Sequence, residues 1–206
     1  MRNKDAWKSR STVRNPVAVL TVAAALAAVG LAGAGTAQAD PVAPGVSVDI
    51  GGSGDGGTFV ADTYGTGGIP DTKPDSVASL PNWGPTVAHP IPAAVWNTSR
   101  FTESSYSVPG LTPGATYQLR LYFLDWYYQQ AGKRVFDVAV DGATVLTDFD
   151  ITGTAQARGA DGQESFGVEE DFPVTVPADG TVTVDFIRGA ENQPQVNALV
   201  IVPADS

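Results

Sequence analysis

Two segments between residues 116 and 149, in which apolar and polar side chains alternate, constrain the fold most strongly. The apolar members recur at every second position: Leu119, Leu121, Phe123, Phe136, Val138 and Val140. A period of two puts these side chains on one face of a β-strand. Asp141-Gly142 then suits a two-residue hairpin turn, because glycine tolerates the positive φ that a type I′ turn requires. The region therefore predicts two strands and a hairpin into a third.

Similar short runs continue on both sides, separated by Gly- and Pro-rich turns at roughly ten-residue spacing. We expect strands at 46–50, 104–108, 116–124, 134–140, 144–149, 172–176, 181–186 and 197–202. Residues 66–92 are predicted to be a long irregular loop. No amphipathic helix or internal repeat is evident. This pattern is typical of an all-β, single-domain β-sandwich.

Residues 1–39 have the three-part composition of a secretory signal peptide. Five basic residues and one acid lie among the first 16, an apolar run covers 17–31, and Ala37-Gln38-Ala39 is a small-x-small cleavage site. A retained membrane anchor is the alternative, but no charged stop-transfer flank follows the run. We therefore expect a secreted protein with a leader at 40–45, a domain at 46–203 and no later membrane segment.

Charge and cysteine content narrow the partners. Residues 1–39 hold five of the 12 Lys and Arg and one of the 22 acids, so their removal leaves a net charge of −14. Such a surface repels nucleic acid, anionic membranes and anionic polysaccharides, which leaves neutral oligosaccharides or polysaccharides as the easier ligands. The chain contains no cysteine, which excludes disulfides and thiolate metal sites.

The aromatic run Trp126-Tyr127-Tyr128 directly follows the predicted strand at 116–124 and precedes the polar loop at 129–132. Tyrosine and tryptophan offer a flat apolar face with a polar edge, which matches the C–H face and hydroxyl rim of a pyranose. We predict that Tyr127 and Tyr128 bind ligand, whereas Trp126 fits the core equally well. The phenylalanines at alternating strand positions are predicted core residues: Phe123, Phe136, Phe149, Phe172 and Phe186.

Six stretches, in the correct order, resemble the malectin family of carbohydrate-binding domains. They are 46–52 (VSVDIGG), 59–68 (FVADTYGTGG), 96–101 (WNTSRF), 125–138 (DWYYQQAGKRVFDV), 148–151 (DFDI) and 191–202 (ENQPQVNALVIV). The resemblance covers about 46–203. It implies a jelly-roll-like, galactose-binding-like sandwich that binds neutral glucosides without catalysis or a cofactor.

The same motifs imply particular ligand-binding residues: Tyr64, Trp96, Tyr127, Tyr128, Asn192 and, beside it, Glu191. Asp62, Arg100 and Asn192 would supply fixed donors and acceptors for sugar hydroxyls. The chain has Trp at 96 where the family has Tyr, which enlarges the predicted stacking plane. It has Asn at 192 where the family often has Asp, which removes a charge.

Other chemistry has weaker support. His89 is the only histidine and no Gly-x-Ser-x-Gly motif accompanies it, so a Ser-His-Asp triad is not predicted. The acids are numerous enough for a small secreted glycan hydrolase with a carboxylate pair, and this alternative stays open. A cell-envelope adhesion or assembly module that binds protein is a second alternative. Glu169-Glu170-Asp171 lacks the alternating ligands of a recognised Ca²⁺ loop, and we expect no metal site.

The first prediction concerns processing. Because cleavage is expected after Ala39, the exported protein should begin at Asp40. Intact-mass measurement of the secreted protein tests this, and a mass that retains Met1 would refute it.

Overall fold

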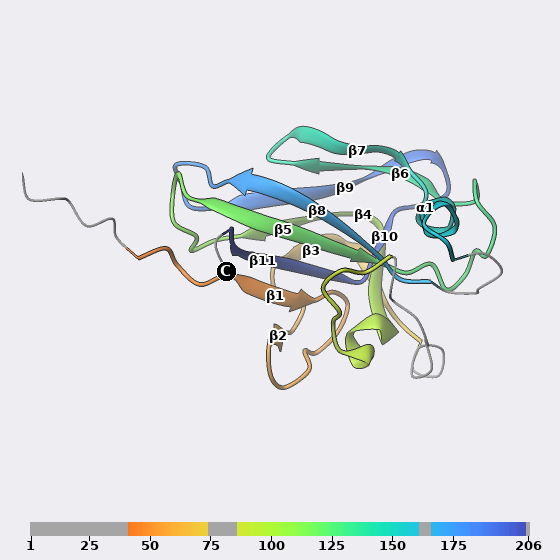
Figure 1. Ribbon diagram of the computed structural model, residues 1–206, viewed down its shortest axis with the longest axis horizontal. Helices are drawn as coiled ribbons and strands as arrows, with labels where there is room; N and C mark the ends of the chain where they lie inside the picture. Colours follow the sequence, from red (N-terminus) through yellow and green to blue (C-terminus); the bar gives the residue numbers. More distant parts are fainter. Residues whose placement is uncertain (1–40, 74–85, 161–165, 205–206) are drawn as a thin grey trace, which may run out of the picture. The chain divides into compact units, whose positions relative to one another are not determined.

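Two β-sheets packed face to face contain about half of the residues that the structure describes (Figure 1). The computed structural model describes residues 41–73, 86–160 and 166–204, so the predicted signal peptide lies outside the described residues. No helix in these described ranges is long and apolar enough to cross a membrane.

The first sheet has the strand order β2-β1-β11-β5-β8. Its members are β1 (Val46–Asp49), β2 (Phe59–Val60), β5 (Thr116–Phe123), β8 (Val168–Thr175) and β11 (Ala198–Pro203). Neighbours are antiparallel except for the short parallel pair of β1 and β2. β5 is therefore flanked by β11 and β8, which come from much later in the sequence.

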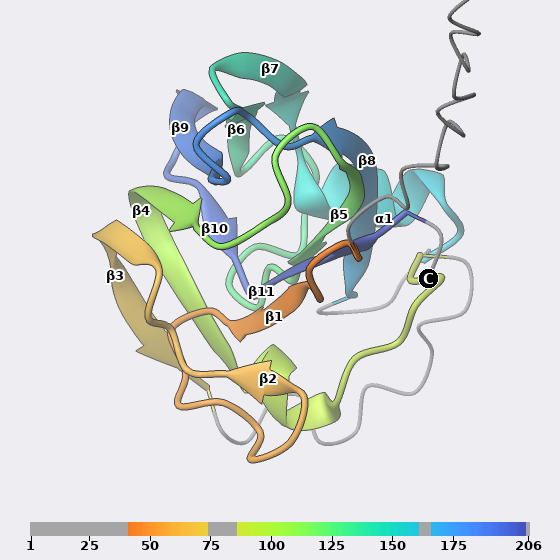
Figure 2. The ribbon, with the colours of Figure 1, turned by 90° about the vertical axis from the view of Figure 1, so that its left-hand side faces the viewer.

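The second sheet has the order β10-β4-β9-β6-β7, and β3 pairs additionally with β4 (Figure 2). Its members are β3 (Gly65–Thr72), β4 (Thr98–Val108), β6 (Val135–Val140), β7 (Ala143–Phe149), β9 (Val182–Glu191) and β10 (Gln195–Val196). The predicted hairpin joins β6 to β7, and Asp141 and Gly142 both have positive φ at its turn. The expected all-β, two-sheet fold is confirmed.

Five described elements were not expected: the two-residue strands β2 and β10, the longer strand β3, and two short helices. β3 occupies the first part of the expected loop at 66–92; its only large apolar side chain, Ile69, is exposed, so no alternating pattern marks it. The helix α1 (Ile151–Ala157) was not expected, because it buries only Ile151 and Ala155 and is too short for a clear helical period. The 3₁₀ helix η1 (Ala93–Asn97) precedes β4.

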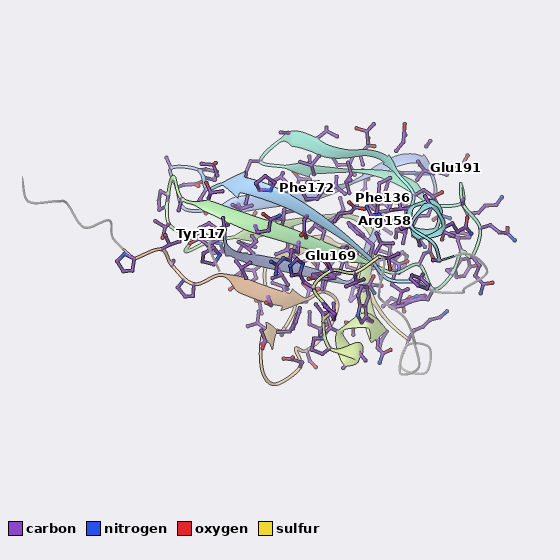
Figure 3. The ribbon with its side chains drawn as sticks, in the orientation of Figure 1. Tyr117, Phe136, Arg158, Glu169, Phe172 and Glu191 are labelled. Carbon is purple, nitrogen blue, oxygen red and sulfur yellow. The ribbon has the colours of Figure 1, made fainter. Side chains whose placement is uncertain are left out.

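The main core lies between the sheets and contains the predicted phenylalanines. Phe123 lies 4.8 Å from Phe149 and 5.9 Å from Phe136, measured between ring centroids. Phe186 is buried beside them, and Phe172 is half-buried against the same core (Figure 3). Rings at alternating positions of β5, β6, β7 and β9 thus fill the space between the sheets.

A second apolar cluster covers the outer face of β5. Tyr122, which the alternation places on the polar side of that strand, is buried there. Trp96 packs edge-on against it at 5.8 Å between ring centroids. Because Leu121 and Phe123 face the main core, the C-terminal end of β5, residues 121–123, is buried on both faces.

The second prediction follows from this packing. Trp96→Ala should lower the free energy of unfolding by about 3–5 kcal/mol, as expected for truncation of a buried aromatic side chain. Phe136→Ala is the reference, because Phe136 is equally buried in the main core. Urea denaturation followed by circular dichroism measures both, and a Trp96 variant as stable as the parent protein would contradict the assignment.

Candidate functional site

A groove of about 290 Å³ opens at the end of the sandwich where β5 stops and β6 begins. The residues that line it come from five separate segments: Asp71, Phe101, Trp126, Tyr127, Tyr128, Arg134, Asn192 and Gln195. Four of the eight are aromatic, and the others supply charged or amide groups. The lining therefore combines apolar planes with convergent hydrogen-bonding groups, the composition of a small-ligand site.

The Asp125 carboxylate holds the aromatic loop in place. Its Oδ1 accepts hydrogen bonds from the backbone N–H groups of Tyr127 and Tyr128, both at 2.9 Å. Its Oδ2 accepts one from Arg134 Nε at 2.7 Å. The side chain is only 1% exposed, so these bonds replace the water that burial removes. Asp125 thus fixes the backbone of the loop that follows β5, and with it the backbone positions of both tyrosines.

Arg134 joins this loop to the one that follows β9. Besides its bond to Asp125, Arg134 Nη1 donates to the carbonyl of Gln193 at 2.7 Å. Its guanidinium carbon also lies 5.4 Å from the centre of the Tyr128 ring, within cation–π range. One buried cation therefore fixes the two loops that form opposite sides of the groove.

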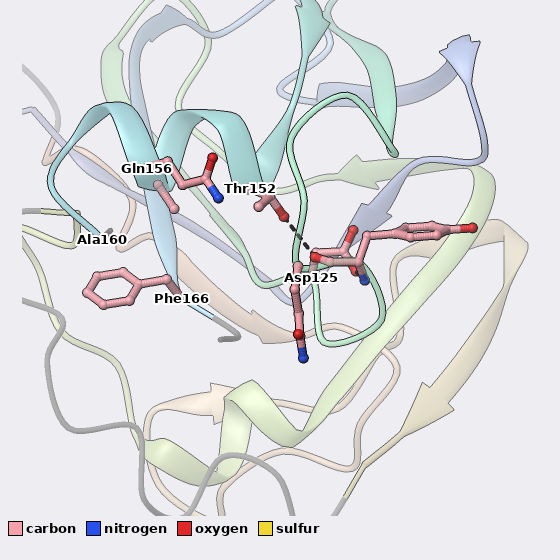
Figure 4. A pocket seen from close by; sticks show the side chains of 8 residues that line it. Asp125, Thr152, Gln156, Ala160 and Phe166 are labelled. Atoms are coloured by element: carbon pink, nitrogen blue, oxygen red, sulfur yellow. Dashed lines mark hydrogen bonds between the residues drawn. The ribbon is translucent and has the colours of Figure 1, made fainter. Parts of the chain in front are cut away.

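The two tyrosines present different surfaces. Tyr127 is 71% exposed, and its ring meets that of Tyr128 edge-on at a centroid distance of 4.8 Å. The Tyr128 hydroxyl accepts a hydrogen bond from Asn192 Nδ2. Its backbone carbonyl accepts one from Thr152 Oγ1 of α1 at 2.9 Å, which supports the loop from behind (Figure 4). Tyr128 is thus held on two sides, while the Tyr127 ring is free to stack on a ligand.

Three of the predicted binding residues lie together in the groove: Tyr127, Tyr128 and Asn192. Asn192 has φ of 58°, and this left-handed conformation directs the chain from β9 toward β10. Asparagine tolerates that conformation better than most residues. Glu191, the last residue of β9, is exposed but is not among the residues that line the groove (Figure 3).

Trp96 does not belong to the groove, contrary to the platform expected from its motif. It has no exposed surface and lies in the second apolar cluster, so neither face of its ring is available to a sugar. Tyr64 is half-buried against the main core and also lies outside the lining. Both residues support the fold instead.

Asp62 and Arg100 also lie outside the lining and are engaged internally. Arg100 Nη2 donates to Asp62 Oδ2 at 2.6 Å, and the hydroxyl of buried Tyr106 donates to Asp62 Oδ1 at 3.0 Å. Gly51 N–H donates to the same carboxylate at 2.8 Å. Burial, together with the charge of Asp62, raises the pKa of Tyr106 above its usual value. These groups join β4 to the loops around β2 and do not face the ligand groove.

Sequence reasoning missed Phe101, Gln195 and Asp71. Phe101 ends the motif that begins with Trp96, and its β4 register brings it beside Gln195 of β10 and Ile69 of β3. The signal was the second aromatic of that motif, but strand pairing alone decides which of the two reaches the groove. Asp71 lies near the end of β3, a strand without an alternating pattern.

The distribution of acids in the groove bears on catalysis. Asp71 is the one carboxylate among the described residues that line the groove. Asp125 lies beneath the loop, paired with Arg134 and saturated with donors. A hydrolytic pair requires two carboxyl groups on either side of a glycosidic bond. The described lining does not supply such a pair.

The third prediction tests the buried ion pair. Arg134→Met should lower the free energy of unfolding by about 3–5 kcal/mol, because it leaves the Asp125 carboxylate buried without its cation. The control is Arg188→Met, whose parent side chain is exposed on β9 and should change stability by less than about 0.5 kcal/mol. Equal stability of the two variants in urea would show that the pair does not hold the loops.

Comparisons of sequence identify relatives. Malectin-A and Malectin-B of Xenopus laevis are 29% and 27% identical over 129 residues. Each match covers 56% of this chain and 44% of the relative, so the chain spans less than half of the relative's length.

Solved structures with the same fold include receptor ectodomains of Arabidopsis thaliana. The ANX2 ectodomain has a TM-score of 0.63 at 17% identity, covering 78% of this chain and 50% of that one. The ANXUR1 extracellular domain has a TM-score of 0.63 at 18% identity, covering 78% and 48%. The family model described as the malectin domain matches residues 47–199. The chain therefore belongs to the malectin family of carbohydrate-binding domains.

Proposed function

We propose that this protein is a secreted, non-catalytic lectin that binds neutral glycans in the groove between the aromatic loop and the loop after β9. The observation that carries the proposal is the exposed Tyr127 ring beside the anchored Tyr128 and Asn192. A pyranose stacked on Tyr127 would meet amide groups from Asn192 and Gln195 at its hydroxyl rim.

The charges of the groove support a neutral ligand. The acidic Asp71 and the basic Arg134 both line it, but Arg134 is committed to Asp125 and to the Gln193 carbonyl. Among the described residues that line the groove, Asp71 is then the charged side chain outside a described ion pair, and it would repel a uronic acid or a sulfated sugar. Its carboxylate would instead accept hydrogen bonds from neutral hydroxyls.

A glycan array probed with residues 40–206 is the direct test. Binding to neutral gluco- or related oligosaccharides, with no turnover of the bound polysaccharide, supports the proposal. Release of reducing ends by the pure protein would instead favour the small glycan hydrolase. Binding confined to uronic or sulfated glycans would contradict the assignment of a neutral ligand.

A protein ligand is the second candidate. One chain of similar fold belongs to the complex of the plant peptide RALF23 with FER and LLG2, with a TM-score of 0.58 and 17% identity. Exposed tyrosines also anchor protein interfaces. An adhesion or assembly module would use the same Tyr127 surface, and an array without glycan binding would favour it.

The fourth prediction separates binding from folding. Tyr127→Ala should weaken binding of the best array ligand by about 1–3 kcal/mol, as for aromatic residues that stack on bases. Because Tyr127 is 71% exposed, Tyr127→Ala should lower the free energy of unfolding far less than Phe136→Ala does. Ile187→Ala is the control, since Ile187 is 38% exposed and lies outside the groove. Titration calorimetry and thermal melts measure both properties. Unchanged affinity in Tyr127→Ala would refute the stacking role.

A further inference from the structure

His89, Glu169 and Asp171 meet on the outer face of the first sheet. Glu169 and Asp171 are two residues apart on β8, so their side chains point to the same face. His89 belongs to the segment that covers this face, 80 residues earlier in the chain. None of the three lines the aromatic groove, so this cluster is separate from the proposed glycan site.

The cluster is held from several directions. Both oxygens of Glu169 face His89: Oε2 accepts from the backbone N–H at 2.7 Å, and Oε1 lies 2.5 Å from ring atom Nδ1. Asp171 Oδ2 lies 3.8 Å from the same Nδ1. The His89 carbonyl accepts from the Tyr122 hydroxyl at 3.0 Å, and Glu169 N–H donates to the Thr86 carbonyl at 2.9 Å. The backbone on both sides is therefore fixed before any ligand arrives.

These three side chains offer one ligand atom each, all within 4.8 Å of one another. Burial, and next the neighbouring Glu169 carboxylate, raise the pKa of Asp171, as expected where two carboxylates share a small volume. Glu170 does not take part, because it lies on the opposite face of β8 and pairs with Arg158. His89 Nδ1 and Glu169 Oε1 lie within hydrogen-bond distance of each other, and a metal ion would bind the same lone pairs.

We propose that His89, Glu169 and Asp171 form a binding site for a divalent transition-metal ion, with Zn²⁺ as the best fit. One imidazole nitrogen and two carboxylate oxygens are ligands that Zn²⁺ accepts, whereas Ca²⁺ takes six to eight oxygens. Bonds of about 2.0–2.2 Å place ligand atoms roughly 3–3.5 Å apart around Zn²⁺. His89 Nδ1 lies 2.5 Å from Glu169 Oε1 and 3.8 Å from Asp171 Oδ2, on either side of this spacing, and its side chain is 46% exposed.

Access and charge set the strength of the site. A hollow of about 250 Å³, lined by Thr86, Ala88, Arg158, Glu169 and Asp171, opens beside the cluster and leaves room for metal-bound water. Two cations weaken the attraction: Arg120 lies opposite Asp171 on β5, and Arg158 donates to the Glu169 carbonyl at 2.9 Å (Figure 3).

The chain suits a clean test because His89 is its only histidine and it has no cysteine. Protein purified without a polyhistidine tag is titrated with ZnCl₂ by calorimetry, and the His89 ring is followed by NMR. Pulsed EPR with Cu²⁺ then reports whether one imidazole nitrogen coordinates the ion. We expect stoichiometric Zn²⁺ binding, a shift of the His89 ring signals and the signature of a single imidazole. Because these measurements use the wild-type protein, their outcome does not depend on whether any variant folds.

Three variants locate the site. His89→Gln and Asp171→Asn should each weaken Zn²⁺ binding by at least about tenfold, since even outer-shell partners of metal ligands contribute this much. Glu103→Gln, an exposed carboxyl on β4 of the other sheet, is the control and should leave affinity unchanged. Absence of Zn²⁺ binding to the folded wild type, or equal affinity in His89→Gln, would overturn the proposal and leave the cluster as an ion pair.

The proposed metal site and the proposed glycan groove can be tested independently of each other. Because they share no residue, glycan binding should persist in EDTA, and Tyr127→Ala should not alter Zn²⁺ affinity. Loss of glycan binding in EDTA, restored by Zn²⁺, would show that the cluster acts on the groove and would contradict their separation.

Discussion

Burial of the C-terminal end of β5 on both faces is the constraint on which the rest of the structure depends. Leu119, Leu121 and Phe123 face the main core, while Tyr122 and Leu124 face the second cluster. β5 lies between β11 and β8, so both edges of its backbone are also hydrogen-bonded. Because its C-terminal end packs against apolar side chains on both faces and both of its edges are paired, β5 cannot shift its register without exposing large apolar side chains. The position of the loop that follows β5 is therefore fixed relative to the sheet.

The groove uses that rigidity. Asp125 follows β5 almost directly, and its carboxylate caps the aromatic loop while Arg134 compensates its charge. The same guanidinium reaches the Gln193 carbonyl, so the loop after β9 is held relative to the loop after β5. Preorganisation of this kind lowers the entropy that a ligand must remove on binding. An exposed Tyr127 on a rigid support would suit the neutral sugar that we propose as the ligand.

The second apolar cluster also determines what lies against β8, the edge strand of the first sheet. It fastens the segment that contains Val87 and Ile91 over β5, and this brings His89 against Glu169 of β8. The apolar residues on either side of His89 thus place an imidazole beside two carboxylates. The proposed glycan groove and the proposed metal site both arise where a loop crosses the end or the face of the same sheet.

The sequence by itself determined the period-two strands, the hairpin at Asp141-Gly142, the phenylalanine core and the position of Tyr127 and Tyr128 in the loop after a strand, because each depends on neighbours close along the chain. It also carried the motifs of the malectin family. Only the tertiary structure decided that Trp96 is core while Phe101 lines the groove, since both are aromatics of one motif and strand pairing separates them. It likewise turned Asp62 and Arg100 into an internal ion pair and brought His89 to Asp171. Those outcomes depend on contacts between residues far apart in sequence, which local patterns do not encode.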